Sequence, residues 1–479
     1  MSTGKQVTKN IIWKYIESYS HTGIQLLTTF ILARFLSPSD YGIMGMVVVF
    51  SSFANVIIDS GFGQALIREK EVTKTDYSTI LYFNLLVSLL LYLLLYMMSG
   101  VIADFYNQEI LNDVCKVTFL ALPLSAISIV QSTKLQKEIR FKKLCIITLI
   151  SSLLSCIITI ILAYIYRNVW ALVFQGIIMN LLKAILLWLT GDFIPNLKFS
   201  VNSLKKYFGF SKNLLISGLI GTFFNNIYTL TIGKIYTPAE LGFYSQAYRV
   251  KSTLSITMTS VVQSVTYPIL AKINNETGDI REAYKKIICI TLMCVGLLMA
   301  LFMGCACDIF ELLMGNKIWR VAGTFFILLG INGILFPLHS INQNILMVKG
   351  DSRTVLLLEI IRRGFMILVI AITSFFDIHI FILGLSIYSI ILLFPNLYFC
   401  GKPINYTIKE QLKDCLPIFT RLAIIISVQI LTNYLTSDIQ IILRVAISLT
   451  AGCITAFIMF RNYIYFKLTI SLLKSISHR

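Results

Sequence analysis

Charged residues are scarce in this chain of 479 residues. Only 13% of the residues are Asp, Glu, Lys or Arg, against about 25% in ordinary soluble domains. Charge is absent altogether from long stretches such as 77–103, 144–166, 287–307 and 321–347. Since about 20 apolar residues are enough to cross a hydrocarbon core as a helix, these stretches argue against a set of soluble domains. They predict an all-α integral membrane protein, because a helix satisfies its own backbone hydrogen bonds in lipid.

Several signatures of soluble chemistry are missing as well. No GxxxxGK[ST] phosphate loop occurs, so ATP hydrolysis by that device is excluded. Cys305 and Cys307 lack the second pair or nearby His that a zinc site requires, and neither a metal nor a cofactor is predicted. The polar N-terminal residues do not resemble a cleaved signal, so the first apolar helix is expected to remain as a span.

Apolar segments separated by charged breaks predict about fourteen transmembrane helices joined by short loops. The predicted spans are 11–33, 41–63, 77–103, 113–132, 144–166, 169–190, 208–233, 241–268, 287–307, 321–347, 354–376, 378–399, 416–436 and 440–460.

The basic residues give these spans an orientation. If the N-terminus is cytoplasmic, 28 of the 41 Lys and Arg residues lie in cytoplasmic segments and 6 in outer loops, and the other 7 fall within spans. This bias follows the positive-inside rule and predicts that both termini are cytoplasmic. It also accounts for the net charge of +18, so no nucleic-acid partner is expected.

A short motif is repeated at an offset of 200 residues. Residues 33–42 read Ala-Arg-Phe-Leu-Ser-Pro-Ser-Asp-Tyr-Gly, and residues 233–242 read Gly-Lys-Ile-Tyr-Thr-Pro-Ala-Glu-Leu-Gly. In both copies Ser/Thr-Pro-x-Asp/Glu predicts the start of a helix, with proline in the first turn and an acid near the positive end of the helix dipole. Six predicted spans separate the copies, which indicates two parallel six-helix lobes and one additional helix pair.

Together with the segments 60–68 and 236–249, this motif resembles the Wzx-type polysaccharide flippases, and more narrowly the WzxC-like branch of the MOP superfamily with its MATE fold. The resemblance covers the whole chain and implies lobes at 1–200 and 201–400 and a helix pair with a cytoplasmic tail at 401–479. It also implies a bacterial inner-membrane transporter, not an enzyme, that moves an undecaprenyl-diphosphate-linked oligosaccharide to the periplasmic leaflet. The expected partners are this cargo and membrane lipids, with a glycan polymerase and a chain-length regulator as further candidates.

Charges within predicted spans are the candidate functional residues, because they are costly in lipid and usually face a cavity or a partner. Cations exceed acids there, which suits a diphosphate. Arg249 is the strongest substrate-binding candidate, because it lies about 12 Å into its span; a buried structural ion pair is the alternative. Helix-internal pairing with Glu359 is the alternative for two of the others. The substrate-binding candidates are Arg249, Lys251, Arg362, Arg363 and Lys183.

The remaining candidates concern coupling and the lipid tail. Glu17, His21 and Asp59 are candidates for proton or sodium coupling or for a gate; a salt bridge of Glu17 with Lys14, one turn away, is the alternative. The thirteenth and fourteenth spans lie outside the repeat and could guide the polyprenyl tail. Their cations, Arg421 and Arg444, are assigned to a lipid-tail groove, although both lie near enough to span ends to snorkel.

Two other functions fit parts of the pattern. A multidrug or cation antiporter of the same fold would depend on one carboxylate, Asp59 or Glu17, and would be expected to show an excess of acids. A membrane glycan polymerase or ligase would need a sizeable outer loop, and the longest candidates, 100–113 and 308–320, are short.

Overall fold

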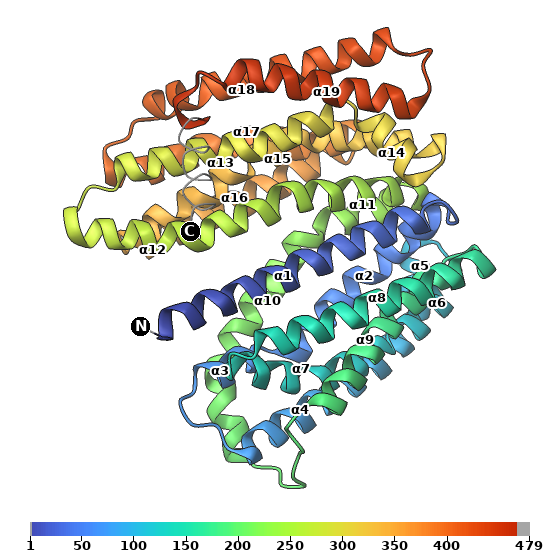
Figure 1. The fold of residues 1–479 in the computed structure, drawn as a ribbon. Helices are drawn as coiled ribbons and strands as arrows, with labels where there is room; N and C mark the ends of the chain where they lie inside the picture. The colour runs from blue at the N-terminus through green and yellow to red at the C-terminus, as the bar shows by residue number, and fades with distance from the viewer. Residues whose placement is uncertain (1, 467–479) are drawn as a thin grey trace. The chain divides into compact units, whose positions relative to one another are not determined.

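The computed structural model describes residues 2–466, which form helices joined by short turns, with no strand among them. They belong to two compact units, Met1–Gly242 and Phe243–Arg479 (Figure 1). The helices that begin in the first unit are α1 (Ser2–Leu32), α2 (Pro38–Asp59), α3 (Phe62–Arg68), α4 (Lys74–Met97), α5 (Ser99–Tyr106), α6 (Ile110–Thr118), α7 (Ala121–Lys137), α8 (Phe141–Tyr166), α9 (Trp170–Thr190), α10 (Val201–Ile235) and α11 (Pro238–Ser252). Those of the second unit are α12 (Met258–Thr277), α13 (Arg281–Met303), α14 (Ala306–Met314), α15 (Arg320–Val348), α16 (Ser352–Thr373), α17 (Ile378–Gly401), α18 (Ile408–Leu435) and α19 (Ile441–Phe460).

Each of the fourteen predicted spans corresponds to helical structure in the described chain. Twelve helical segments of residues 2–466 are long and apolar enough to cross a membrane. The helices α1 and α16 are not among the twelve, because polar and charged side chains such as Glu17, His21 and Glu359 interrupt their apolar character. The basic tail beyond Phe466, which contributed to the predicted cytoplasmic C-terminus, lies outside the described residues.

Helix α10 belongs to the first compact unit, and the lobe boundary at residue 200 stays a prediction. It packs against α2, and it also contacts α3 and α4. The compact units therefore divide at residue 242. In the same unit α8 lies between α1 and α9, and α7 packs on both α4 and α9.

A sharp break separates α2 from α3. Ser60 and Gly61 adopt left-handed backbone angles, with φ of 44° and 74°, and the chain resumes a helix at Phe62. A Cβ on Gly61 would lie 2.9 Å from Cβ of Leu214 on α10. At position 61 only glycine fits without strain, and the turn sets the direction of the side chains on either side of it.

Gly61→Ala is therefore expected to lower the free energy of unfolding by about 1–3 kcal/mol, through the left-handed backbone and the close contact together. The measurement is chemical unfolding of the purified protein in detergent. Gly209→Ala on α10 is the matched control, because nothing lies within 4 Å of its added Cβ. If both variants unfold at the same denaturant concentration, the break does not depend on glycine.

Both copies of the repeated motif form the same helix start, as predicted. In the first copy, the backbone N–H of Ser37 donates to the Asp40 carboxylate at 2.8 Å, and the Asp40 N–H donates to the Ser37 hydroxyl at 3.3 Å. In the second copy, Thr237 and Glu240 make the same two bonds at 2.8 and 3.3 Å. These reciprocal bonds are a capping box, which satisfies two N–H groups that the helix itself leaves unpaired.

The two copies also pack on each other, backbone to backbone. A Cβ on Gly42 would lie 1.7 Å from the carbonyl oxygen of Pro238, and a Cβ on Gly242 would lie 1.8 Å from that of Pro38. Each glycine of one copy thus receives the proline carbonyl of the other. The motif therefore encodes both a helix start and a close crossing of α2 with the beginning of α11.

Helix α15 is the centre of the second unit. It packs on α12, α13, α14 and α17, and it contains two of the largest fully buried side chains among the described residues, Phe325 and Phe326. A π-helical turn, Thr253–Thr257, joins α11 to α12, and the Ser255 hydroxyl in this turn donates to the Gly333 carbonyl at 2.6 Å. The pair α18 and α19 forms an antiparallel hairpin, drawn in red in Figure 1, and α18 packs on α13.

Candidate functional site

An open cavity of about 450 Å³ lies within the first unit, formed by α2, α3, α7 and α9. It brings together Asp59 and Lys183, which the sequence singled out separately, one as a coupling residue and the other as a substrate ligand. Most of the remaining lining is uncharged and polar. The polar lining residues are Asn55, Asp59, Gln64, Ser125, Ser128, Ser132, Thr133, Gln136, Asn180 and Lys183.

The break between α2 and α3 positions Asp59. This residue is the last of α2, and its carboxylate accepts a hydrogen bond from the backbone N–H of Gly63, the second residue of α3. The Gly63 Cα lies so close to α7 that an added Cβ would be 3.2 Å from the Thr133 hydroxyl oxygen. Backbone groups therefore hold the carboxylate at the wall of the cavity while leaving part of it open.

Lys183 enters the same cavity from α9. Within residues 2–466 its ammonium makes no hydrogen bond and no ion pair shorter than 4 Å. Glu17 and His21 on α1 lie near enough to interact with it electrostatically. Because Lys183 has no direct ion pair among the described residues, it can bind a ligand atom without first breaking a salt bridge.

Glu17 and His21 are engaged at the contact of α1 with α8. The Glu17 carboxylate, in a residue that is 8% exposed, pairs with Lys14 at 2.9 Å and accepts from the Thr148 hydroxyl at 3.2 Å. His21 Nδ1 lies 2.8 Å from the Ser152 hydroxyl. The ion pair anticipated from helical spacing is present, so Glu17 is less open to a ligand than Asp59.

Arg249 and Lys251 occupy different environments on α11, as two positions of separation on a helix require. Arg249 is exposed. Lys251 is only 3% exposed, and its ammonium lies 4.8 Å from the centre of the Tyr248 ring. Among the described residues no acid pairs with Lys251. Burial of an unpaired ammonium is costly, and an anion bound beside Lys251 would offset that cost.

Arg362 and Arg363 of α16 are paired within their own helix. Glu359 binds Arg362 at 2.7 Å and Arg363 at 3.4 Å, and it accepts from the Gln343 side chain of α15 at 3.2 Å. One carboxylate therefore serves two guanidinium groups. The helix-internal pairing anticipated from the sequence is present.

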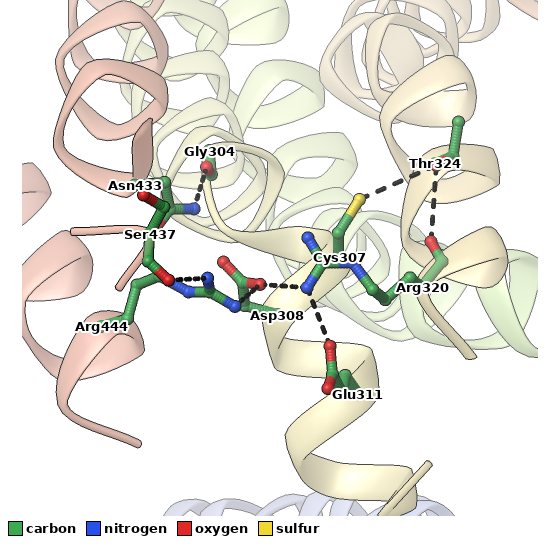
Figure 2. A network of polar contacts seen from close by, with 9 residues as sticks. All are labelled: Gly304, Cys307, Asp308, Glu311, Arg320, Thr324, Asn433, Ser437 and Arg444. Carbon is green, nitrogen blue, oxygen red and sulfur yellow. Dashed lines mark hydrogen bonds and ion pairs between the residues drawn. The ribbon is translucent and has the colours of Figure 1, made fainter. Parts of the chain in front are cut away.

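Arg421 and Arg444 connect the helices of the second unit. Arg421 donates to the carbonyl of Met459 at 3.0 Å and lies 4.5 Å from the centre of the Tyr463 ring, which ties α18 to the end of α19. Arg444 donates to the Asp308 carboxylate at 2.6 Å and thereby ties α19 to α14 (Figure 2). A role for either residue in a lipid-tail groove stays a prediction.

Asp308 is the shared acceptor of the network in Figure 2, and sequence reasoning did not select it. Its side chain is 5% exposed and binds both Arg444 and Arg320 at 2.6 Å. Arg320 also pairs with Glu311 at 2.8 Å. The sequence pattern that could have revealed this network is the pair of acids Asp308 and Glu311, three positions apart, followed by Arg320. In the structure these acids lie on α14, which packs on α15 and α19.

Solved structures show which fold this chain has. The chain is similar to the lipid II flippase MurJ in an inward closed conformation, with a TM-score of 0.71 and 14% identity over 95% of this chain and 100% of that one. It is also similar to an inward-facing multidrug resistance MATE transporter of the MOP superfamily, with a TM-score of 0.59 and 15% identity over 80% and 96% of the two chains. The chain therefore has the MOP transporter fold, which confirms the predicted fold class.

Sequence comparison adds the family. A family model described as polysaccharide biosynthesis protein matches residues 31–322, more than half of the chain, and the chain belongs to this family. TuaB, a teichuronic acid biosynthesis protein of Bacillus subtilis (strain 168), is 27% identical over 355 residues, or 73% of each chain. The predicted resemblance to polysaccharide transporters is thereby confirmed.

Two other relatives match a smaller share of their length. WzxC, a lipopolysaccharide biosynthesis protein of Escherichia coli (strain K12), is 22% identical over 60% of this chain and 59% of its own. ExoT, a succinoglycan biosynthesis transport protein of Rhizobium meliloti (strain 1021), is 23% identical over 57% and 55%. Transport proteins and a flippase thus recur among the relatives and structural neighbours, which confirms the prediction of a multi-pass membrane transporter instead of an enzyme.

Proposed function

We propose that this protein moves an undecaprenyl-diphosphate-linked oligosaccharide from the cytoplasmic to the periplasmic leaflet of a bacterial inner membrane by alternating access. Family membership supports a role in polysaccharide biosynthesis, and the fold is one that flippases use. The orientation with both termini in the cytoplasm belongs to the same proposal. A glycan polymerase and a chain-length regulator are its proposed partners.

The excess of cations over acids within the helices is the observation that carries this proposal. Glu17 and Glu359 are paired with basic residues of their own helices, and among the described residues no acid pairs with the buried Lys251. A diphosphate brings at least two negative charges into a region of low dielectric, where cations bind it strongly. A site for cationic drugs would require the opposite balance. We assign the diphosphate to Arg249 and Lys251, with Arg363 and Arg362 as secondary ligands.

Coupling to protons or sodium forms a separate part of the proposal. Asp59 is the favoured coupling residue, because its carboxylate faces the cavity of the first unit. Glu17 and His21 are bound to Lys14, Thr148 and Ser152. We therefore assign Glu17 and His21 to a gate, in which they hold α1 against α8.

Arg249→Ala and Arg363→Ala test the diphosphate assignment in a strain from which the native gene is deleted. Each lost charged hydrogen bond is worth about 1.5–3 kcal/mol, so transport at low cargo concentration is expected to fall by about ten- to a hundredfold. The readout is surface glycan per cell, normalised to the amount of protein in the membrane. Arg353→Ala, an exposed arginine at the start of the same helix as Arg363, is the control and is expected to behave as wild type. Normal glycan from both test variants would place the diphosphate elsewhere.

A further inference from the structure

We propose that the cavity of the first unit is a sugar subsite, which binds a saccharide ring of the cargo through amide side chains. This inference rests on the proposed function. It assigns to the cavity a ligand of different chemistry from the diphosphate, namely an uncharged polyol. Asn55, Gln64, Gln136 and Asn180 are the residues assigned to it.

The hydrogen-bonding capacity of these amides is only partly used. Asn180 donates one N–H to the carbonyl of Gly176 at 2.9 Å. Asn55 donates one N–H to the carbonyl of Ser51 at 2.8 Å and accepts from Ser125 at 3.2 Å. In the part of the chain that the structure describes, the side chains of Gln64 and Gln136 make no hydrogen bond. An amide offers both donors and acceptors, which matches the hydroxyl groups of a sugar, since each of these also donates and accepts.

The net charge of the cavity argues against the diphosphate as its ligand. Asp59 and Lys183 are its two charged residues, and their charges balance. A neutral cavity provides no net attraction for an anion, and the cations assigned to the diphosphate lie on other helices, α11 and α16. The cargo therefore meets two chemistries: cations suited to its phosphates, and amides and hydroxyls suited to its sugars.

Size and position agree with this assignment. The volume of about 450 Å³ falls within the range of about 300–1,000 Å³ that is usual for small-molecule sites. The helices α2, α7 and α9 lie in segments that are long and apolar enough to cross a membrane, and a sugar hydroxyl without a partner in apolar surroundings costs about 2–7 kcal/mol. A polar wall removes part of that cost and would favour sugars whose hydroxyl groups match the amides.

The test compares two probes on the purified full-length protein in lipid nanodiscs. One probe is bare polyprenyl diphosphate. The other is polyprenyl diphosphate bearing a disaccharide, taken as the tightest binder from a panel with a hexose, an N-acetylhexosamine or a uronic acid as first sugar. Asn180→Ala and Gln64→Ala are each expected to weaken binding of the disaccharide lipid by about three- to tenfold, as expected for one or two lost hydrogen bonds. Binding of the bare lipid is expected to stay unchanged.

Asn226→Ala on α10 is the matched control. Like Asn180, Asn226 donates to the carbonyl four residues earlier in its helix, at 2.8 Å, but it does not line the cavity. The Asn226→Ala variant should bind both probes as tightly as wild type does. Asn55→Ala provides a third test variant if one of the first two does not fold. Equal weakening of both probes, unchanged binding of both, or an effect only on the response to pH or sodium would overturn the sugar subsite. Failure of the wild type to bind either lipid would instead overturn the proposed function.

Discussion

Gly42→Ala is expected to destabilise the protein by about 3 kcal/mol, because overpacking against rigid backbone cannot be relieved by a change of rotamer. The added Cβ would lie 1.7 Å from the carbonyl oxygen and 2.6 Å from the carbonyl carbon of Pro238. The capping box at Thr237 and Glu240 fixes that carbonyl at the start of α11, so α2 and α11 must separate. The measurements are the unfolding free energy of the purified protein in detergent and the surface glycan of a complemented deletion strain.

The reciprocal contact supplies an internal check on this prediction. Gly242→Ala places a Cβ 1.8 Å from the carbonyl oxygen of Pro38 and should cause a loss of similar size. Gly221→Ala on α10, where nothing lies within 4 Å of the new Cβ, is the control and should raise stability by about 0.5–1 kcal/mol through helix propensity. Stabilities of Gly42→Ala and Gly242→Ala within about 0.5 kcal/mol of wild type would show that the crossing is not tightly packed.

Asp308→Ala is the second substitution with a large expected effect. It leaves the Arg444 guanidinium, whose side chain is 14% exposed, without its carboxylate, and it removes one of the two acids that bind Arg320. Loss of one partner from a buried ion pair costs about 3–5 kcal/mol, because the remaining charge stays desolvated. The α18–α19 hairpin should loosen first, and faster hydrogen exchange in α19 than in α9 would report this.

Control and rescue variants separate this effect from a general loss of charge. Glu276→Ala removes the partner of Lys272 in a pair whose side chains are 59% and 75% exposed, and it should change stability by less than about 1 kcal/mol. Asp308→Glu retains the charge and should recover part of the loss. If Asp308→Ala unfolds like Glu276→Ala, the network of Figure 2 contributes little to holding α19.

The pairing of Arg444 with Asp308 could not be predicted from the position of either charge in the sequence. From the sequence, Arg444 lay near the end of a span, where a long side chain can extend to the interface. Asp308 is 136 positions away along the chain, in a segment that was interpreted as a loop. No local pattern connects the two, since only the packing of α19 on α14 brings them together.

The cavity of the first unit illustrates the same limit. Asp59 and Lys183 were both selected, because charges in apolar helices are rare, but they were assigned different functions. The turn at Ser60 and Gly61 and the packing of α7 against α9 place them in one cavity. The amides beside them gave no signal, because a single Asn or Gln in a helix has no distinctive spacing.

The sequence by itself determined the features that depend on local chemistry. Apolar length predicted the spans, and the repeated Ser/Thr-Pro-x-Asp/Glu motif predicted two capped helix starts that the structure contains. The orientation inferred from the distribution of Lys and Arg stays a prediction. Each of these depends on neighbours within one or two helical turns or on the properties of a single segment. Only the tertiary structure decided which charges are neutralised, which face a cavity, and that each motif glycine receives the other motif's proline carbonyl. Those outcomes depend on contacts between segments far apart in the chain, whose partners are selected by packing and not by local composition.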